Sequence, residues 1–508
     1  MDYIELIMPK LQPIVINNFS GGIADDVRKV SASEFSITRH FDIFSNPQRL
    51  TPYRSLEADT ETSVSATDLK QYLVRDFVYA TGSAKLYGLG QTSGGLTKIL
   101  QKADATTGLW TTPASSEGNG AVLNGCFFEY KDYLWGFQGT TSLFKWGLLS
   151  GSPSITNATA TVGATITSVA NGVIHAATGY AYLAYNNVIV RIQPDLTITD
   201  SAKTVPDNYK ITSITNYGSY LAIAAAPISS FNGTSKVYLW NGSSDTFFET
   251  IDWGEGEIRI LESVEGILVG VTDRYLNNST GAGRGSMIIQ IYSGGSAQVF
   301  KEIFTQALTG KTIPISKSVK NNRLFWAAKI MTNSAGTEYV EGIWSLGRKN
   351  SNYPFAITLD IIDENIDTDG IQAFGTAANY FFIAHSLDGS VDKTNDSSIY
   401  TFTSVYESQI FDFGVFQQTK KLDKFTIYTA YLPSGASVTV KYKFDDDTSF
   451  TTIGTFSTQG SLTRDFINIE STGAVFPNFK EAQFRIESTG GAEILGYRIE
   501  ATSFIGLS

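Results

Sequence analysis

Short apolar runs rich in aromatic residues alternate with polar turns along most of the 508-residue chain. The clearest case is GCFFEYKDYLWGFQGTTSLFKWG, residues 125–147, where Lys131-Asp132 separates two such runs and a turn beginning at Gly139 precedes a third. The three runs are Cys126–Tyr130, Tyr133–Phe137 and Leu143–Trp146. Runs of this kind, joined by a few polar residues, are typical of antiparallel hairpins. The stretch therefore predicts three consecutive strands.

The same pattern recurs over residues 66–405. The pieces that we predict as inner strands are AKLYGLG (84–90), DYLWGF (132–137), YAYLAY (180–185), SYLAIA (219–224), GILVGV (266–271), RLFWAA (323–328) and NYFFIAH (379–385). Equivalent pieces lie about 40 to 58 residues apart, which suits four-stranded propeller blades of ~40–50 residues. Packing blades radially covers both apolar faces of each sheet and leaves only short edges. We predict a β-propeller of about seven blades, with six or eight as the alternatives.

The pattern changes after residue 405. Five or more alternating strands fit into about a hundred residues, which is typical of a β-sandwich. In TVKYKF, the apolar residues Val440, Tyr442 and Phe444 alternate with Lys441 and Lys443, so one face is expected to be buried and the other solvated. We predict that residues 406–508 form a C-terminal β-sandwich, jelly-roll-like in topology.

Residues 1–65 contain few signals for paired strands. Gly21-Gly22 and the prolines Pro47 and Pro52 indicate an extended N-terminal arm. Two interpretations stay open for this arm. It packs across its own chain or closes the propeller ring, or it grips a neighbouring subunit.

The composition narrows the possible functions. Only 17% of residues are charged, 13% are aromatic and the net charge is −11, so a generic nucleic-acid-binding surface is not expected. The one exception is a DNA conduit, in which an acidic lining would keep the DNA from sticking. The single cysteine, Cys126, lies in an apolar run and is interpreted as a small buried hydrophobe. We see no signal peptide and no apolar run of the ~18–20 residues that a membrane span needs.

The candidate chemistry is sparse. The three histidines, His40, His175 and His385, are far apart in sequence and form no zinc motif. A propeller glycosidase would need paired carboxylates, and the chain offers two groups that could supply them. These are Asp252, Glu255 and Glu257, and Asp360, Asp363 and Glu364. Only a degenerate fragment, SSDTFFETIDW (243–253), is similar to a sialidase box, and it lacks the glycine. We therefore predict no enzyme, no catalytic residue and no cofactor.

Two acidic clusters are weak calcium candidates, because calcium takes six to eight oxygen ligands from flexible turns. They comprise Asp445, Asp446 and Asp447, and Asp392 with Asn395 and Asp396. Neither has the spacing of an EF-hand loop, and solvated polar turns between strands are the favoured alternative.

Several segments together resemble virion structural proteins of tailed bacteriophages. They are NNFSGGIADDVR (17–28), FDIFSNPQRLTPYRS (41–55), and the ending ESQIFDFG (407–414), KKLDKF (420–425), VTVKYKFDDDTSF (438–450) and FRIE (484–487). The resemblance extends loosely over the whole chain and rests on no diagnostic motif. It carries over no catalytic residue. In architecture the chain is similar to the propeller-bearing tail nozzle proteins of short-tailed phages.

The resemblance implies a non-enzymatic structural component of the tail or head-to-tail region. Such a protein would be assembled in the host cytoplasm and located in the virion. It would join other virion proteins as a multi-copy homo-oligomeric ring, with no membrane span and no specific nucleic-acid binding. Two alternatives stay open. The chain could be a host-surface glycan-binding module for receptor recognition, or, third in order, a propeller glycosidase.

Overall fold

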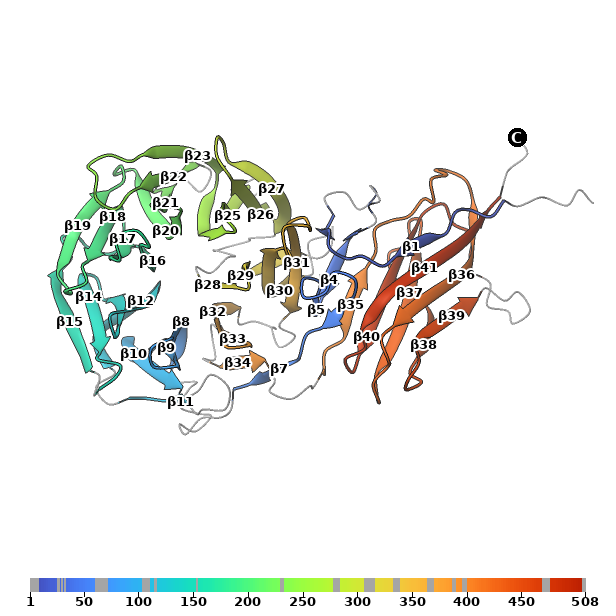
Figure 1. Cartoon of the computed structure of the whole chain (residues 1–508), viewed down its shortest axis with the longest axis horizontal. Coiled ribbons are helices and arrows are strands. Elements are labelled where there is room, and N and C mark those ends of the chain that lie inside the picture. The colour runs from blue at the N-terminus through green and yellow to red at the C-terminus, as the bar shows by residue number, and fades with distance from the viewer. Residues whose placement is uncertain are drawn as a thin grey trace, which may run out of the picture. The chain divides into compact units, whose positions relative to one another are not determined.

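The computed structural model shows an all-β protein, as the pattern of apolar runs predicts (Figure 1). It describes residues 9–504 except 25–27, 29–30, 32, 60–71, 103–109, 114–116, 152–153, 229–232, 277–283, 306–315, 332–338, 363–369, 386–389, 395–399 and 468–475. Within these residues no helix is present that could cross a membrane. The chain divides into two compact units. We call Leu56–Gly342 with Asp363–Thr394 the ring unit, and Met1–Ser55 with Ile343–Ile362 and Asn395–Ser508 the terminal unit.

Four-stranded antiparallel sheets follow one another along the chain, and in most of them the strands pair in chain order. They are β16 (Val169–Ile174), β17 (Ala181–Tyr185), β18 (Val188–Ile192) and β19 (Ile198–Thr204); β20 (Tyr209–Tyr217), β21 (Tyr220–Pro227), β22 (Thr234–Trp240) and β23 (Glu249–Glu255); β24 (Glu257–Val264), β25 (Ile267–Leu276), β26 (Arg284–Tyr292) and β27 (Gln298–Thr305); β28 (Lys317–Lys320), β29 (Arg323–Met331), β30 (Tyr339–Gly347) and β31 (Ala356–Ile362); and β32 (Ile371–Ala377), β33 (Tyr380–His385), β34 (Val391–Thr394) and β7 (Leu56–Ala58).

The strands before residue 165 form one larger sheet with the order β15-β14-β13-β12-β10-β9-β8, in which β11 also pairs with β10. Its strands are β8 (Leu73–Ala80), β9 (Lys85–Gln91), β10 (Leu96–Lys102), β11 (Trp110–Thr111), β12 (Glu117–Tyr130), β13 (Tyr133–Gln138), β14 (Ser142–Gly147) and β15 (Ser154–Thr161). The predicted hairpins of residues 125–147 are confirmed, because β12 pairs with β13 and β13 with β14. Lys131 and Asp132 both have positive φ, as a two-residue type I′ turn requires.

The first strands of these sheets surround a common axis, which defines a β-propeller (Figure 1). The strands β8, β12, β16, β20 and β24 contact one another in that order, and β28 contacts β32, which contacts β8 again. One prediction is wrong in detail. The runs predicted as inner strands are the second strands of their sheets, such as β17 and β21, and the strand before each lies nearest the axis (Figure 1).

A segment from the N-terminal region completes the last sheet of the ring unit. The short strand β7 pairs with β34, joining Asp392 to Ala58 in antiparallel register. The next residue, Asp59, donates its N–H to the carbonyl of Val391 (2.8 Å). The carboxylate of Asp59 accepts two hydrogen bonds from Lys102 Nζ (2.7 and 2.8 Å) and one from Trp110 Nε1 (2.7 Å). Because β10 and β11 carry these two partners, the closing segment bonds to both ends of the ring.

The terminal unit contains two antiparallel sheets around one apolar core. One has the order β1 (Ile14–Ile16), β41 (Ile494–Ser503), β36 (Lys420–Thr429) and β39 (Thr463–Ile467); the other has the order β38 (Thr451–Phe456), β37 (Ser437–Phe444), β40 (Ala482–Thr489), β35 (Ser404–Glu407) and β4 (Ile37–Arg39). Two small pairs complete the unit: β2 (Gly22–Ile23) with β3 (Glu34–Phe35), and β5 (Phe41–Asp42) with β6 (Thr51–Pro52). The predicted alternation in β37 is confirmed, since Val440, Tyr442 and Phe444 are buried and the two lysines between them are not.

The described part of residues 1–65 is built into the sheets of its own chain. Strand β1 pairs with β41, β4 pairs with β35, and β7 pairs with β34. These pairings are what the first interpretation of the arm expects, a peptide that packs on its own chain and closes the ring. The division between the two units passes through β30, and it also places β31 with the terminal unit. The domain limits at residues 65 and 405 stay predictions.

Candidate functional site

Five first strands of the ring unit, β8, β16, β20, β24 and β32, contain a β-bulge or register shift near the start of the strand. The register shifts between Val74 and Asp76, Ala170 and Val173, Ile211 and Ser213, Ile258 and Ile260, and Ile371 and Ala373. The single residues in four of these bulges are Arg75, Thr212, Arg259 and Gln372, which we call the axial bulge residues. A bulge bends its strand and re-aims a side chain. Polar residues therefore occupy bulges on strands that lie nearest the axis (Figure 1).

Some polar groups near the bulges join neighbouring sheets. The Asn171 Oδ1 atom accepts hydrogen bonds from Ile214 N and Ser213 Oγ (both 2.9 Å), and Asn171 Nδ2 donates to the carbonyl of Ile214 (2.7 Å). The Ser213 Oγ atom in turn accepts a hydrogen bond from Leu261 N (3.2 Å). Backbone groups that a bulge leaves without ladder partners are satisfied in this way. These side chains serve the fold.

Two carboxylates on β24 are paired with cations. Glu257 lies 3.0 Å from Lys210 Nζ and 2.6 Å from a guanidinium nitrogen of Arg259. Glu262 lies 2.8 Å from Lys317 Nζ. Burial raises the pKa of Glu262, but the charge of Lys317 and the hydrogen bonds from Lys317, Thr215 and Ser263 outweigh it, so the pKa is lowered overall. Both carboxylates act as structural partners of cations.

Arg75 differs from Lys210, Arg259 and Lys317, which are each paired with a carboxylate. Its guanidinium donates to Gln372 Oε1 (2.7 Å) and to Gln91 Oε1 (3.1 Å), both neutral acceptors. Burial lowers the pKa of Arg75. The next residue, Asp76, accepts a hydrogen bond from Phe77 N (2.9 Å). Burial raises the pKa of Asp76 to about 7, against the lowering effect of the backbone N–H groups of Phe77 and Phe127.

Among the described residues, the carboxylates considered for glycoside hydrolysis lie in separate surroundings and do not form a catalytic pair. Asp252 is exposed on β23 and lies 3.3 Å from Lys236 Nζ, and Glu255 is exposed at the end of the same strand. Glu257 is buried between its cations on β24. Asp360 is buried on β31, where it accepts a hydrogen bond from Thr358 Oγ1 (2.6 Å). Asp363 and Glu364 lie outside the described residues.

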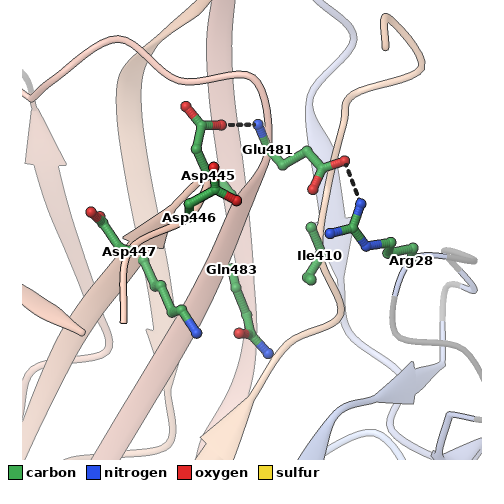
Figure 2. A pocket seen from close by; sticks show the side chains of 9 residues that line it. Arg28, Ile410, Asp445, Asp446, Asp447, Glu481 and Gln483 are labelled. Carbon is green, nitrogen blue, oxygen red and sulfur yellow. Dashed lines mark hydrogen bonds and ion pairs between the residues drawn. The ribbon is translucent and has the colours of Figure 1, made fainter. Parts of the chain in front are cut away.

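The calcium candidates lie in two different settings. Asp445, Asp446 and Asp447 are exposed in the turn after β37 and line a shallow pocket of 210 Å³ with Arg28 and Glu481 (Figure 2). The Asp445 carboxylate already accepts hydrogen bonds from the backbone N–H groups of Lys480 (2.7 Å) and Glu481 (2.8 Å). Across the described part of the chain, no group of three or more side chains has the geometry of a metal site. These contacts are those of the alternative interpretation, a polar turn.

The second calcium candidate, Asp392 on β34, lies beside a histidine of β33. Asp392 is buried and lies 3.3 Å from His385 Nε2. Its predicted companions Asn395 and Asp396 lie outside the described residues. The two calcium candidates belong to different units, Asp392 to the ring unit and the acidic turn to the terminal unit.

The remaining histidines and the cysteine have structural surroundings. His40 is buried and stacks on Phe402 with ring centroids 4.4 Å apart. His175 Nε2 lies 3.1 Å from the carbonyl of Ser219, and burial lowers the pKa of His175. Cys126 is free and buried, and burial raises the pKa of its thiol. Its interpretation as a buried hydrophobe is confirmed.

An exposed aromatic pair was not predicted from the sequence. Phe248, in the loop before β23, is 66% exposed and stacks on Tyr220 with ring centroids 4.6 Å apart and an interplanar angle of 22°. The loop is held by Asn241 Oδ1, which accepts hydrogen bonds from Ser243 N (3.0 Å) and Ser244 N (2.8 Å). The available signal was the dipeptide Phe247-Phe248 in an otherwise polar loop. In a loop, two adjacent apolar residues lack the alternation of a strand that would place them on a buried face.

The comparisons with known proteins found structures with partial similarity and no relative in sequence. Neither a protein-family model nor a curated protein sequence matches the chain. Among solved structures, the chain is similar to the WD40 domain of Neurospora crassa Pan2, with 11% identity, 68% of this chain and 95% of that chain covered, and a TM-score of 0.41. It is also similar to virginiamycin B lyase from Staphylococcus aureus, with 11% identity, 67% and 99% covered, and a TM-score of 0.43.

A third similar structure is the WD40 β-propeller domain of Doa1, with 11% identity, 68% of this chain and 98% of that chain covered, and a TM-score of 0.41. At such identities and scores these similarities carry no inference about activity or partners. The propeller assignment rests on the order of the strands and on their contacts around the axis.

Proposed function

We propose that the chain is a non-enzymatic structural component of a bacteriophage virion, in the tail or head-to-tail region. The observation that carries the proposal is that acidic side chains considered for catalysis or metal binding are engaged in structural contacts. Glu257 is paired with Lys210 and Arg259, Asp360 accepts from Thr358, and Asp445 holds a turn. Groups committed to such contacts stabilise an architecture, and the resemblance of the sequence to phage virion proteins supplies the context.

The finer architecture forms part of this proposal. We count seven blades by treating β8–β11 and β12–β15 as two blades of the larger sheet and β32–β34 with β7 as the last. The long strand β12 pairs with both β10 and β13, which joins the first two blades into one hydrogen-bonded sheet. The two sheets of the terminal unit are the faces of a sandwich, for which we keep the jelly-roll-like topology.

As a virion component, the chain would assemble into a multi-copy ring with copies of itself and with other virion proteins. The pairing of β1, β4 and β7 with later strands rules out a simple test by truncation of residues 1–60. Removing them would delete β1, β4 and β7 from the sheets that they complete. A test that keeps the fold intact is immunogold labelling of purified phage particles with antibodies raised against the whole chain. Gold at the tail or neck supports the proposal, and particles without label contradict it.

One observation favours a second function, recognition of glycans on the host surface. The exposed ring of Phe248, backed by Tyr220, offers a flat apolar platform of the kind on which sugar rings stack. Glu249 lies beside it and accepts a hydrogen bond from Tyr292 Oη (3.0 Å). If this function is correct, Phe248→Ala weakens binding to host polysaccharide at least tenfold. Tyr431→Ala, at an exposed aromatic of the terminal unit, is the matched control and leaves binding unchanged.

A further inference from the structure

The guanidinium of Arg75 has no acidic partner among the described residues. Its two hydrogen bonds go to the side-chain oxygens of Gln372 and Gln91, and its Nε–H is buried with no hydrogen-bond partner in the described part of the chain. The neighbouring carboxylate of Asp76 is bound by backbone N–H groups and does not pair with it. Half-buried charge without a counter-charge is costly, so such a cation is usually paired.

The equivalent bulge on β24 also contains an arginine, and that arginine is paired with a carboxylate of its own chain. Arg259 occupies that bulge, and its guanidinium lies 2.6 Å from the Glu257 carboxylate. At the bulge of β32, the residue next to Arg75 is Gln372, which is neutral. The two arginines occupy the same structural position in different sheets. Of these two arginines, only Arg75 has no acidic partner in the part of the chain that the structure describes.

Gln372 adds a second donor to this site. Its Oε1 atom accepts the hydrogen bond from Arg75, because a guanidinium can only donate, so its Nε2 amide group is directed elsewhere. No residue in the described ranges accepts a hydrogen bond from that Nε2 group, and it is not among the buried side-chain atoms that lack a partner. A charged fork and a neutral N–H₂ donor therefore lie side by side on β8 and β32.

We propose that Arg75 and Gln372 form a binding site for an oxyanion at the axis of the ring unit. The ligand carries a carboxylate or a phosphate group, because the guanidinium fork fits either by paired N–H···O bonds. The anion supplies the counter-charge that the described residues do not provide at Arg75. The site does not depend on the function proposed above, since the contacts that define it lie within the ring unit.

The test is isothermal titration calorimetry of the full chain at fixed ionic strength, with chloride as the reference anion. One arm titrates inorganic phosphate, and a second titrates a triglutamate peptide, so that the arms separate a free phosphate from a peptide carboxylate. The structure predicts saturable binding in at least one arm. Arg75→Gln should weaken that binding at least tenfold, because the charge is lost while the side chain keeps polar groups. Arg259→Gln, at the equivalent bulge, should change it by less than twofold.

A second variant separates binding from a purely structural role for Arg75. Gln372→Glu provides an internal carboxylate at the position of the present acceptor, so it should abolish anion binding while the chain stays folded, as judged by circular dichroism. Absence of binding to the unaltered chain in both arms, or equal affinity in the unaltered chain and Gln372→Glu, would overturn the proposal. Should Arg75→Gln fail to fold, the Gln372→Glu result alone decides between the two roles.

Discussion

The two units of the chain bury their apolar side chains in different ways. The terminal unit has one continuous core, in which residues of both sheets, such as Phe425, Phe484 and Tyr497, pack together. The ring unit has separate clusters, each shared by neighbouring sheets. One of these joins β8–β10 to β32–β34, the first and last parts of the ring. The terminal unit is therefore stabilised as one body, whereas the ring unit depends on every interface, including the one that closes it.

The largest effect is expected at the closure. Asp59→Ala leaves Lys102 buried and unpaired, since both side chains of this ion pair are fully buried at 2.7 Å. Breaking such a pair from one side should lower the free energy of unfolding by about 3–5 kcal/mol. Urea unfolding followed by tryptophan fluorescence measures it. Asp252→Ala is the matched control, because its pair with Lys236 is exposed and is expected to contribute less than about 1 kcal/mol. Equal effects of the two variants would contradict the role of the closing segment.

A matched pair of core truncations sharpens the comparison between units. Leu422 belongs to the single core of the terminal unit, and Leu221 belongs to the cluster between the β16–β19 and β20–β23 sheets; both are fully buried. Leu422→Ala and Leu221→Ala should each lower stability by about 2–5 kcal/mol. Hydrogen exchange with mass spectrometry should show the loss of protection across the whole terminal unit for Leu422→Ala. For Leu221→Ala the loss should begin in the two sheets that share the cluster, and uniform loss in both variants would contradict the separate clusters.

The smallest effect concerns Asp76 and is read as a pH dependence. Its pKa is about 7 in the folded chain, above the ordinary value of 3.8, because burial favours the neutral acid. The folded state therefore holds the proton more tightly, and the carboxyl group lowers stability as the pH rises through 7. Relative to pH 5.5, the unaltered chain should lose up to about 2 kcal/mol at pH 8 through this group. Asp76→Asn should remove that part of the slope in denaturant titrations at several pH values. A slope unchanged in the variant would contradict the assignment.

The strand pattern was predictable because the second and third strands of each sheet are short, buried and apolar. Runs such as Ala181–Tyr185 and Leu221–Ala226 therefore stand out in the sequence. The sequence pattern did not identify the strands that lie nearest the axis. Residues such as Arg75, Thr212 and Gln372 interrupt their apolar pattern, and the bulges break the alternation of faces.

Local sequence patterns could not predict the segment that closes the ring or the surroundings of the candidate site residues. Strand β7 pairs with a strand more than 300 residues later, and three residues give no periodicity to recognise. Asp59 lies in a polar stretch of the sequence, yet it contacts Lys102 and Trp110 in the interior. Among the candidate carboxylates, Asp252 and Glu257 are close in sequence but lie on different sheets, and their surroundings depend on Lys236, Lys210 and Arg259. Only the recurrence of a polar residue near the start of each first strand could have revealed the axial bulges.

The proposed role as a multi-copy virion component is tested most directly by the mass and symmetry of the purified chain. Mass photometry gives the mass, and negative-stain imaging of the same sample and of its parent particle gives the symmetry. The account predicts a mass several times the 55.3 kDa of one chain, with a ring or a symmetric density in a tail or neck. A stable monomer that is absent from any particle would contradict it and would place glycan binding at Phe248 first.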